Sequence, residues 1–211
     1  MQVSLAQVSL TKGNNEDYWI AEGIFKEIDW KKEFPYDLYE KVLPSVVEEL
    51  SSHVHYHRSS PYGGEDPNDT TVGDCHQWHG TSQSLRSSLI LVWHLEQFPY
   101  QKYPELKARF VSEFGMESFP NIRTVDSYIS NKVARHTRSR VVEAHNKCGG
   151  AGRRLDAYVG ENFRFESDLE SWVYVTQLLQ AESVGAAYRG WRREWRGEGK
   201  EYCGGVLVWQ V

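Results

Sequence analysis

The stretch ARFVSEFGMESFP, residues 108–120, gives the strongest indication of the fold. Residues 109–114 alternate apolar and polar side chains as a half-buried strand does, and a glycine ends the pattern. Glu113 lies at the end of this predicted strand, among apolar neighbours. Because an unpaired buried carboxylate is costly, Glu113 needs either a structural partner, such as Arg109 or Arg135, or a chemical role.

A second carboxylate, Glu16, follows a predicted strand near the start of the sequence. Residues 1–10 alternate and lead to Lys12 and Gly13, which is typical of a strand that ends in a turn. Catalytic side chains lie at this position in barrels of parallel strands, although most acidic residues of any chain are simply solvated. Two carboxylates on one barrel face can cleave a glycosidic bond with retention when they lie roughly 5–5.5 Å apart.

The rest of the pattern predicts helices that alternate with short strands. Helical spacing of apolar side chains occurs at 22–33, at 37–51 with a kink at Pro44, and at 167–196. Further strands are predicted at 53–57, at 72–78 with a continuation at Val92 and Trp93, and at 204–210, which should be buried on both faces. Residues 124–129 begin a helical region, residues 131–165 are polar and poorly patterned, and the glycine-rich run at 149–152 predicts a flexible connection. This order indicates an α/β fold with a parallel sheet in one domain, residues 1–211.

The composition narrows the range of partners. The net charge is −5 and no long basic stripe occurs, so we expect no nucleic-acid partner. No apolar stretch reaches membrane-spanning length, so no membrane partner is expected, and the first residues lack a signal-peptide pattern. The three cysteines form no CxxC pair, which favours a reducing compartment, and we predict a cytoplasmic protein. The 8 Trp and 12 Tyr suit a core, but also the flat platforms on which sugars stack.

A metal-dependent hydrolase is a competing hypothesis. His53, His55 and His57 would point to one face if residues 53–57 formed a strand. His76 or His79 could then complete a metal site. The plainer interpretation is an exposed strand whose histidines have no chemical role, because no Asp or Cys lies at a convincing ligand spacing.

Several segments together resemble the catalytic barrel of the β-mannosidases of glycoside hydrolase family 2, most of all its fungal branch. The segments occur in family order and cover nearly the whole chain: GNNEDYW (13–19), SSPYGG (59–64), GDCHQW (73–78), ARFVSEFGMESFP (108–120), HNKCGGAGRR (145–154), ENFRFESDLESWVYVTQLLQAE (161–182) and YRGWRREWRGEGKEYCGGVLVWQ (188–210). Long motifs in one shared order are hard to reach by chance, so the resemblance is specific.

The resemblance implies a partial (β/α)₈ TIM barrel, roughly strands four to eight, within an α/β fold. Glu16 matches the acid/base at the end of strand four, and Glu113 matches the nucleophile at the end of strand seven. The implied reaction is the hydrolysis of terminal, non-reducing β-D-mannose from β-mannosides with retention of configuration.

The same resemblance implies a set of substrate-binding residues. Asn15 matches the residue that hydrogen-bonds the sugar 2-hydroxyl, and His76, Trp78 and Trp209 match residues that line the mannose pocket. β-Mannoside oligosaccharides are the implied partners, and no metal or organic cofactor is implied.

The sequence departs from the family pattern in three places. Residues 79–91, HGTSQSLRSSLIL, intervene where the family runs almost directly from HQW into VWH, and resemble a foreign insertion such as a retained intron. No segment matches barrel strands one to three, and the family continues beyond residue 211. We therefore expect the 211 residues alone to have little or no activity, because an open half-barrel should not hold two carboxylates in place. A catalytically inactive interaction module is the alternative function.

Overall fold

The computed structural model describes residues 36–62, 69–77, 99–146, 151–164, 167–197, 199–200 and 202–209. The strand predicted at 1–10, the helix at 22–33, the strand at Val92 and Trp93 and the insertion at 79–91 lie outside these residues. The chain divides into two compact units. Unit 1 comprises Met1–Leu89, Leu106–Phe114 and Trp191–Trp209, and unit 2 comprises Ile90–Glu105, Gly115–Gly190 and Gln210–Val211.

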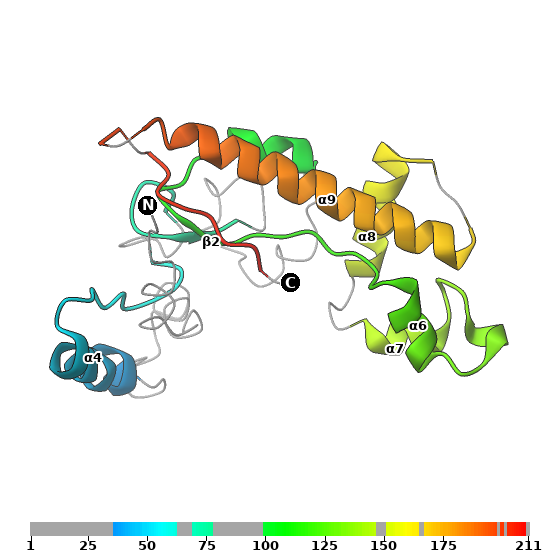
Figure 1. Ribbon diagram of the computed structural model, residues 1–211, viewed down its shortest axis with the longest axis horizontal. Helices are drawn as coiled ribbons and strands as arrows, with labels where there is room; N and C mark the ends of the chain where they lie inside the picture. The colour runs from blue at the N-terminus through cyan, green and yellow to red at the C-terminus, as the bar shows by residue number, and fades with distance from the viewer. Residues whose placement is uncertain are drawn as a thin grey trace, which may run out of the picture. The chain divides into compact units, whose positions relative to one another are not determined.

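A small parallel sheet forms the centre of unit 1. Strand β1, Cys75–His76, pairs in parallel with β2, Val111–Glu113. On the other side of β2, Val206 forms a parallel bridge to Val111. The backbone amide of Leu207 donates to the Val111 carbonyl at 2.8 Å, and Figure 1 shows this red C-terminal segment alongside β2. The predicted strands at 72–78 and 109–114 are therefore confirmed in shorter form.

The predicted strand at 204–210 is only partly correct. Among the described residues it makes a single bridge, at Val206, and residues 205–208 are half-buried instead of enclosed on both faces. The core of unit 1 lies beside it, where Phe114 and Trp191 meet edge to face with ring centroids 5.0 Å apart. The indole nitrogen of Trp191 donates to the Leu106 carbonyl at 2.9 Å, so this large side chain is buried with its polar atom satisfied.

The predicted helix at 37–51 is confirmed as two consecutive segments in unit 1. The π-helix η1, Leu38–Val42, continues into α4, Leu43–Ser51. Pro44 lies in the first turn of α4, where a missing backbone N–H costs little, so the helix restarts there instead of breaking.

The strand predicted at 53–57 is wrong. After α4 ends at Ser51, the chain turns, with the Val54 amide donating to the Ser51 carbonyl at 2.8 Å, and continues without regular structure. The hydroxyl of Tyr56 donates to the Tyr39 carbonyl at 2.7 Å, which ties this segment back to the preceding helix. Alternating histidines mimic a strand period here, but within the described part of the chain no neighbouring strand pairs with them.

Unit 2 is helical. Its elements are the 3₁₀ helix η2 (Tyr100–Glu105), α6 (Ile122–Tyr128), the 3₁₀ helix η3 (Lys132–Ala134), α7 (Arg140–His145), α8 (Ala151–Asn162) and most of α9 (Leu169–Glu194). The long helix predicted at 167–196 is confirmed as α9, the orange ribbon of Figure 1. The poorly patterned stretch 131–165 holds η3, α7 and α8, and the flexible connection predicted at 149–152 is wrong from Ala151 on, where α8 begins.

Two apolar clusters hold unit 2 together along α9. Leu155 and Val159 of α8 pack against Trp172 and Leu179 of α9. A second cluster joins α6, α7 and the start of α9, through Val125, Ile129, Val142, Leu169 and Val173. The described chain is thus a mixed α/β structure, mostly helical, with a small parallel sheet. Within the described residues, no helix is both long and apolar enough to cross a membrane.

Candidate carboxylate site at the ends of two parallel strands

Glu113 ends strand β2, and His76 ends strand β1 beside it. The two strands are not in regular register, because Cys75 pairs with Val111 but His76 pairs with Glu113. This irregularity, a β-bulge, places the imidazole next to the carboxylate, with His76 Nδ1 3.3 Å from Glu113 Oε2. The His76 side chain is 1% exposed and that of Glu113 is 12% exposed. A carboxylate that is mostly enclosed but still reachable from solvent is suited to chemistry.

The two arginines that could have made Glu113 purely structural have other partners. Arg135 pairs with Asp126 at 2.7 Å and with Glu170 at 2.5 Å, all within unit 2. The guanidinium of Arg109 lies over the Tyr202 ring, 5.2 Å from its centroid. Arg135 and Arg109 therefore each have a partner other than Glu113.

A buried carboxylate, Asp74, organises the polar groups behind this pair. It is 4% exposed and accepts from Ser60 Oγ at 2.9 Å, from the Tyr62 amide at 3.0 Å and from Ser112 Oγ. His57 Nε2 lies 2.6 Å from its Oδ1. Hydrogen bonds of this kind offset the cost of burying a charge.

The sequence alone does not predict a functional role for Ser60, Ser112 or Asp74. They come from the motifs SSPYGG, VSEFG and GDCHQW, so each lay within a recognised segment. The sequence feature that could have indicated this cluster is Ser112, a hydroxyl residue within an otherwise apolar strand. A buried serine indicates a polar partner, but it does not say where in the chain the partner lies.

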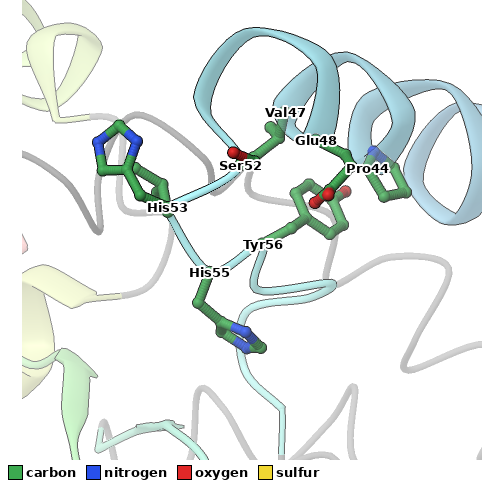
Figure 2. A pocket seen from close by; sticks show the side chains of 8 residues that line it. Pro44, Val47, Glu48, Ser52, His53, His55 and Tyr56 are labelled. Carbon is green, nitrogen blue, oxygen red and sulfur yellow. The ribbon is translucent and has the colours of Figure 1, made fainter.

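The histidines of the metal hypothesis do not converge. His57 contacts Asp74, whereas His53 and His55 line a shallow hollow beside the end of α4. Figure 2 shows the rings of His53 and His55 pointing in different directions from the irregular segment after α4. Among the described residues, no group of three or more His, Cys, Asp or Glu side chains could hold a metal ion. His79 lies outside these residues.

The remaining site residues predicted from the sequence are only partly placed. The backbone amide of Trp209 donates to the Phe114 carbonyl at 2.8 Å, so Trp209 lies beside the end of β2, with 47% of its surface exposed. The described residues thus bring His76, Glu113 and Trp209 to one region of unit 1. Asn15, Glu16 and Trp78 lie outside the described residues.

Cys75 lies next to His76 but is not suited to act as a nucleophile. Burial raises the pKa of its thiol to about 12, so the thiolate is scarce at neutral pH. Cys75 and Cys203 are both buried free thiols.

Comparisons with known proteins show which enzymes this chain is similar to. The β-mannosidase B of Aspergillus flavus is 43% identical over 210 residues, which cover 94% of this chain and 23% of the relative. That of Aspergillus niger is 41% identical with the same coverage. This chain is homologous to part of fungal β-mannosidase B. It spans about a quarter of the length of these curated relatives.

A solved structure supports the same homology. The crystal structure of a β-D-mannosidase from Dictyoglomus thermophilum matches with a TM-score of 0.69 and 30% sequence identity. The match covers 83% of this chain and 20% of that chain. No protein-family model matches the sequence. The resemblance to β-mannosidases predicted from the motifs is therefore confirmed over part of these enzymes.

Proposed function

We propose that this chain forms the nucleophile-bearing part of a retaining β-mannosidase site. The observation that carries the proposal is the position of Glu113, at the end of a parallel strand and 3.3 Å from the buried imidazole of His76. Homology to β-mannosidase B supplies the substrate class, terminal β-D-mannose in β-mannosides.

The proposed fold is a (β/α)₈ barrel, in which β1, β2 and the bridge at Val206 belong to strands six, seven and eight. Their parallel pairing in chain order supports this, because consecutive strands of such a barrel are parallel neighbours. Side chains at the carboxyl ends of these strands then share one face, which is where barrel enzymes hold their active sites. The insertion at 79–91 and the cytoplasmic location stay predictions from the sequence.

The proposed reaction has two steps. The carboxylate of Glu113 attacks the anomeric carbon while Glu16 protonates the departing glycosidic oxygen, which leaves mannose covalently bound to Glu113. Glu16 then takes a proton from water, which attacks the same carbon and releases β-mannose with its configuration retained. Asn15, His76, Trp78 and Trp209 are proposed to hold the sugar.

A mechanism-based inactivator tests the role of Glu113. Because the relatives are about four times longer, we would replace the matching segment of the A. flavus enzyme with residues 1–211 of this chain. A version without residues 79–91 would be made in parallel. We expect 2-deoxy-2-fluoro-β-mannosyl fluoride to label the peptide that contains Glu113, and Glu113→Gln to abolish both labelling and turnover of an aryl β-mannoside.

Two outcomes would contradict the proposal. Label on a different carboxylate would overturn the assignment of Glu113. A folded, soluble chimera that is neither labelled nor active, with or without 79–91, would favour the catalytically inactive module instead.

A further inference from the structure

The bulge between β1 and β2 changes which carbonyl the second strand offers to the first. The backbone amide of Cys75 donates to the Phe110 carbonyl at 2.9 Å. The amide of Gln77, two residues further along, donates to the Glu113 carbonyl at 2.7 Å, three residues beyond Phe110. In a regular parallel pair the two strands advance together, so the Gln77 amide would instead donate to the Ser112 carbonyl. The bulge therefore moves the ladder by one residue of β2.

This shift of one residue decides which side chain lies beside His76. With the bulge, His76 pairs with Glu113. Without it, His76 would pair with Ser112. Glu113 would then turn to the opposite face of the sheet, since side chains alternate along a strand. The position of Glu113 thus depends on an irregular pairing that a regular one could replace.

The side chain of Ser112 fastens the bulge to the residue that precedes β1. Its hydroxyl donates to Asp74 Oδ2 and also lies 3.3 Å from the Cys75 carbonyl oxygen. Ser112 is 8% exposed, so water cannot easily replace these acceptors. In the regular pairing Ser112 would lie opposite His76, further from Asp74 along the strand. Because a buried hydroxyl that loses its acceptor is costly, the bond to Asp74 favours the bulged pairing.

Asp74 is a fixed point for this contact, because donors from another segment already hold it. The Tyr62 amide and Ser60 Oγ donate to it at 3.0 Å and 2.9 Å, and His57 Nε2 lies 2.6 Å from its Oδ1. The carboxylate is 4% exposed. Buried networks of satisfied polar groups rigidify a structure, so Asp74 cannot simply follow Ser112 if β2 shifts.

We propose that Ser112 and Asp74 are positioning residues, whose hydrogen bond holds the bulge and so keeps Glu113 beside His76. The effect on the pairing of the strands rests on the contacts of these residues alone. The effect on catalysis rests on the proposed function, in which the Glu113 carboxylate must lie at a set distance from the sugar. A hydroxyl that merely filled its place in the core would leave the pairing unchanged when it is removed.

Two substitutions of nearly equal size separate the hydroxyl of Ser112 from the volume of its side chain. Ser112→Thr keeps the hydroxyl and adds a methyl group, whereas Ser112→Val carries two methyl groups and no hydroxyl. Scalar couplings across hydrogen bonds, measured by NMR on the full 211-residue chain labelled with ¹⁵N and ¹³C, show which carbonyl accepts the Gln77 amide. We expect the Glu113 carbonyl in the wild type and in Ser112→Thr. In Ser112→Val, the coupling to Glu113 should be lost or replaced by one to residue 112.

A third variant, Ser112→Ala, adds no atom and should also lose the coupling to Glu113. If the coupling to Glu113 persists in Ser112→Ala and Ser112→Val, the hydroxyl does not hold the bulge and the proposal is wrong. Loss of the coupling in Ser112→Thr and Ser112→Val, but not in Ser112→Ala, would also contradict it, because the added methyl group would then be the cause.

Kinetics on the active chimera test the consequence for catalysis, with Ser59 as the matched control. A misplacement of about 1 Å can cost roughly 100-fold in rate, so Ser112→Val should lower kcat by about that factor with KM nearly unchanged. Ser112→Thr should retain most of kcat. Ser59 is also fully buried, but its hydroxyl donates to the Pro61 carbonyl at 3.0 Å instead of to Asp74. Ser59→Ala should therefore leave kcat within about twofold.

The two experiments separate failure of this inference from failure of the proposed function. Equal values of kcat in Ser112→Thr and Ser112→Val would overturn the positioning role. A chimera without activity would count against the proposed function, while the NMR couplings would still decide whether the hydroxyl holds the bulge.

Discussion

At the residue scale, burial decides which charged contacts matter. Asp74 is nearly inaccessible to solvent, and the loss of one hydrogen bond to a buried charged group costs roughly 1.5–3 kcal/mol. The pair Lys41–Asp37 has a similar distance, 2.7 Å, but both side chains are mostly exposed. Exposed pairs of this kind contribute little to stability, because water screens them and two flexible side chains must be ordered. The stability of unit 1 therefore depends on the environment of Asp74 far more than on its surface pairs.

Gly73, next to Asp74, is a residue for which no other side chain fits. Its φ is +63°, and a Cβ there would lie 1.8 Å from the Tyr62 carbonyl oxygen. We expect Gly73→Ala to lower the free energy of unfolding by about 2 kcal/mol or more, measured by urea denaturation. Gly199, with φ +74° and no atom within 4 Å of an added Cβ, is the control for backbone strain alone. Equal losses in Gly73→Ala and Gly199→Ala would show that the contact with Tyr62 contributes nothing.

At the element scale, the helices and strands with the strongest local sequence patterns were predicted correctly. Strand β2 and helix α9 carry apolar periodicity over their whole length, and each formed close to its predicted position. The histidine alternation at 53–57 failed because a strand needs a neighbour to pair with. Helix α8 was missed because its glycines and charges weaken the local signal, and because Trp172 and Leu179, which cover its apolar face, come later in the chain.

Substitutions at two helical glycines can measure the helix preference of alanine separately from the packing between helices. Gly160, in α8, has no atom within 4 Å of an added Cβ, whereas at Gly190, in α9, that atom would lie 2.5 Å from Pro104 Cα of η2. We expect Gly160→Ala to stabilise unit 2 by about 0.5–1 kcal/mol. Gly190→Ala should destabilise it by about 1–3 kcal/mol, because η2 must move away. Thermal unfolding of both variants checks this, and a gain in stability for Gly190→Ala would contradict the close packing.

At the scale of the whole molecule, the candidate site is assembled from distant parts of the chain. Ser60 lies 14 positions from Asp74, and Ser112 lies 38 positions from it. The sequence could indicate Glu113, because its strand and its motif surround it. It could not indicate that these serines meet at Asp74, because that depends on how the strands pair in three dimensions.

Alkaline pH should destabilise the folded protein. Burial raises the pKa of Cys75 from 9.0 to about 12 and that of Tyr56 from 10.0 to about 12, so the folded state keeps protons that the unfolded chain releases. This stabilisation is complete below pH 9 and is lost as the pH rises towards about 12. Urea denaturation should show a lower free energy of unfolding at about pH 10.5 than at about pH 8, with a smaller difference in Cys75→Ala. A pH-independent stability over this range would contradict the burial of the thiol.

The bulge between β1 and β2 bears on how this sequence can change over evolutionary time. Ser112 is the residue left over between the two pairs, Cys75 with Val111 and His76 with Glu113. Deleting one residue there would restore even pairing and turn Glu113 to the opposite face of the sheet, since side chains alternate with a period of two. Substitutions at this place alter one side chain, whereas a single-codon deletion would remove the carboxylate from its imidazole altogether. The contact between Glu113 and His76 therefore depends on the spacing of this motif as well as on its residues.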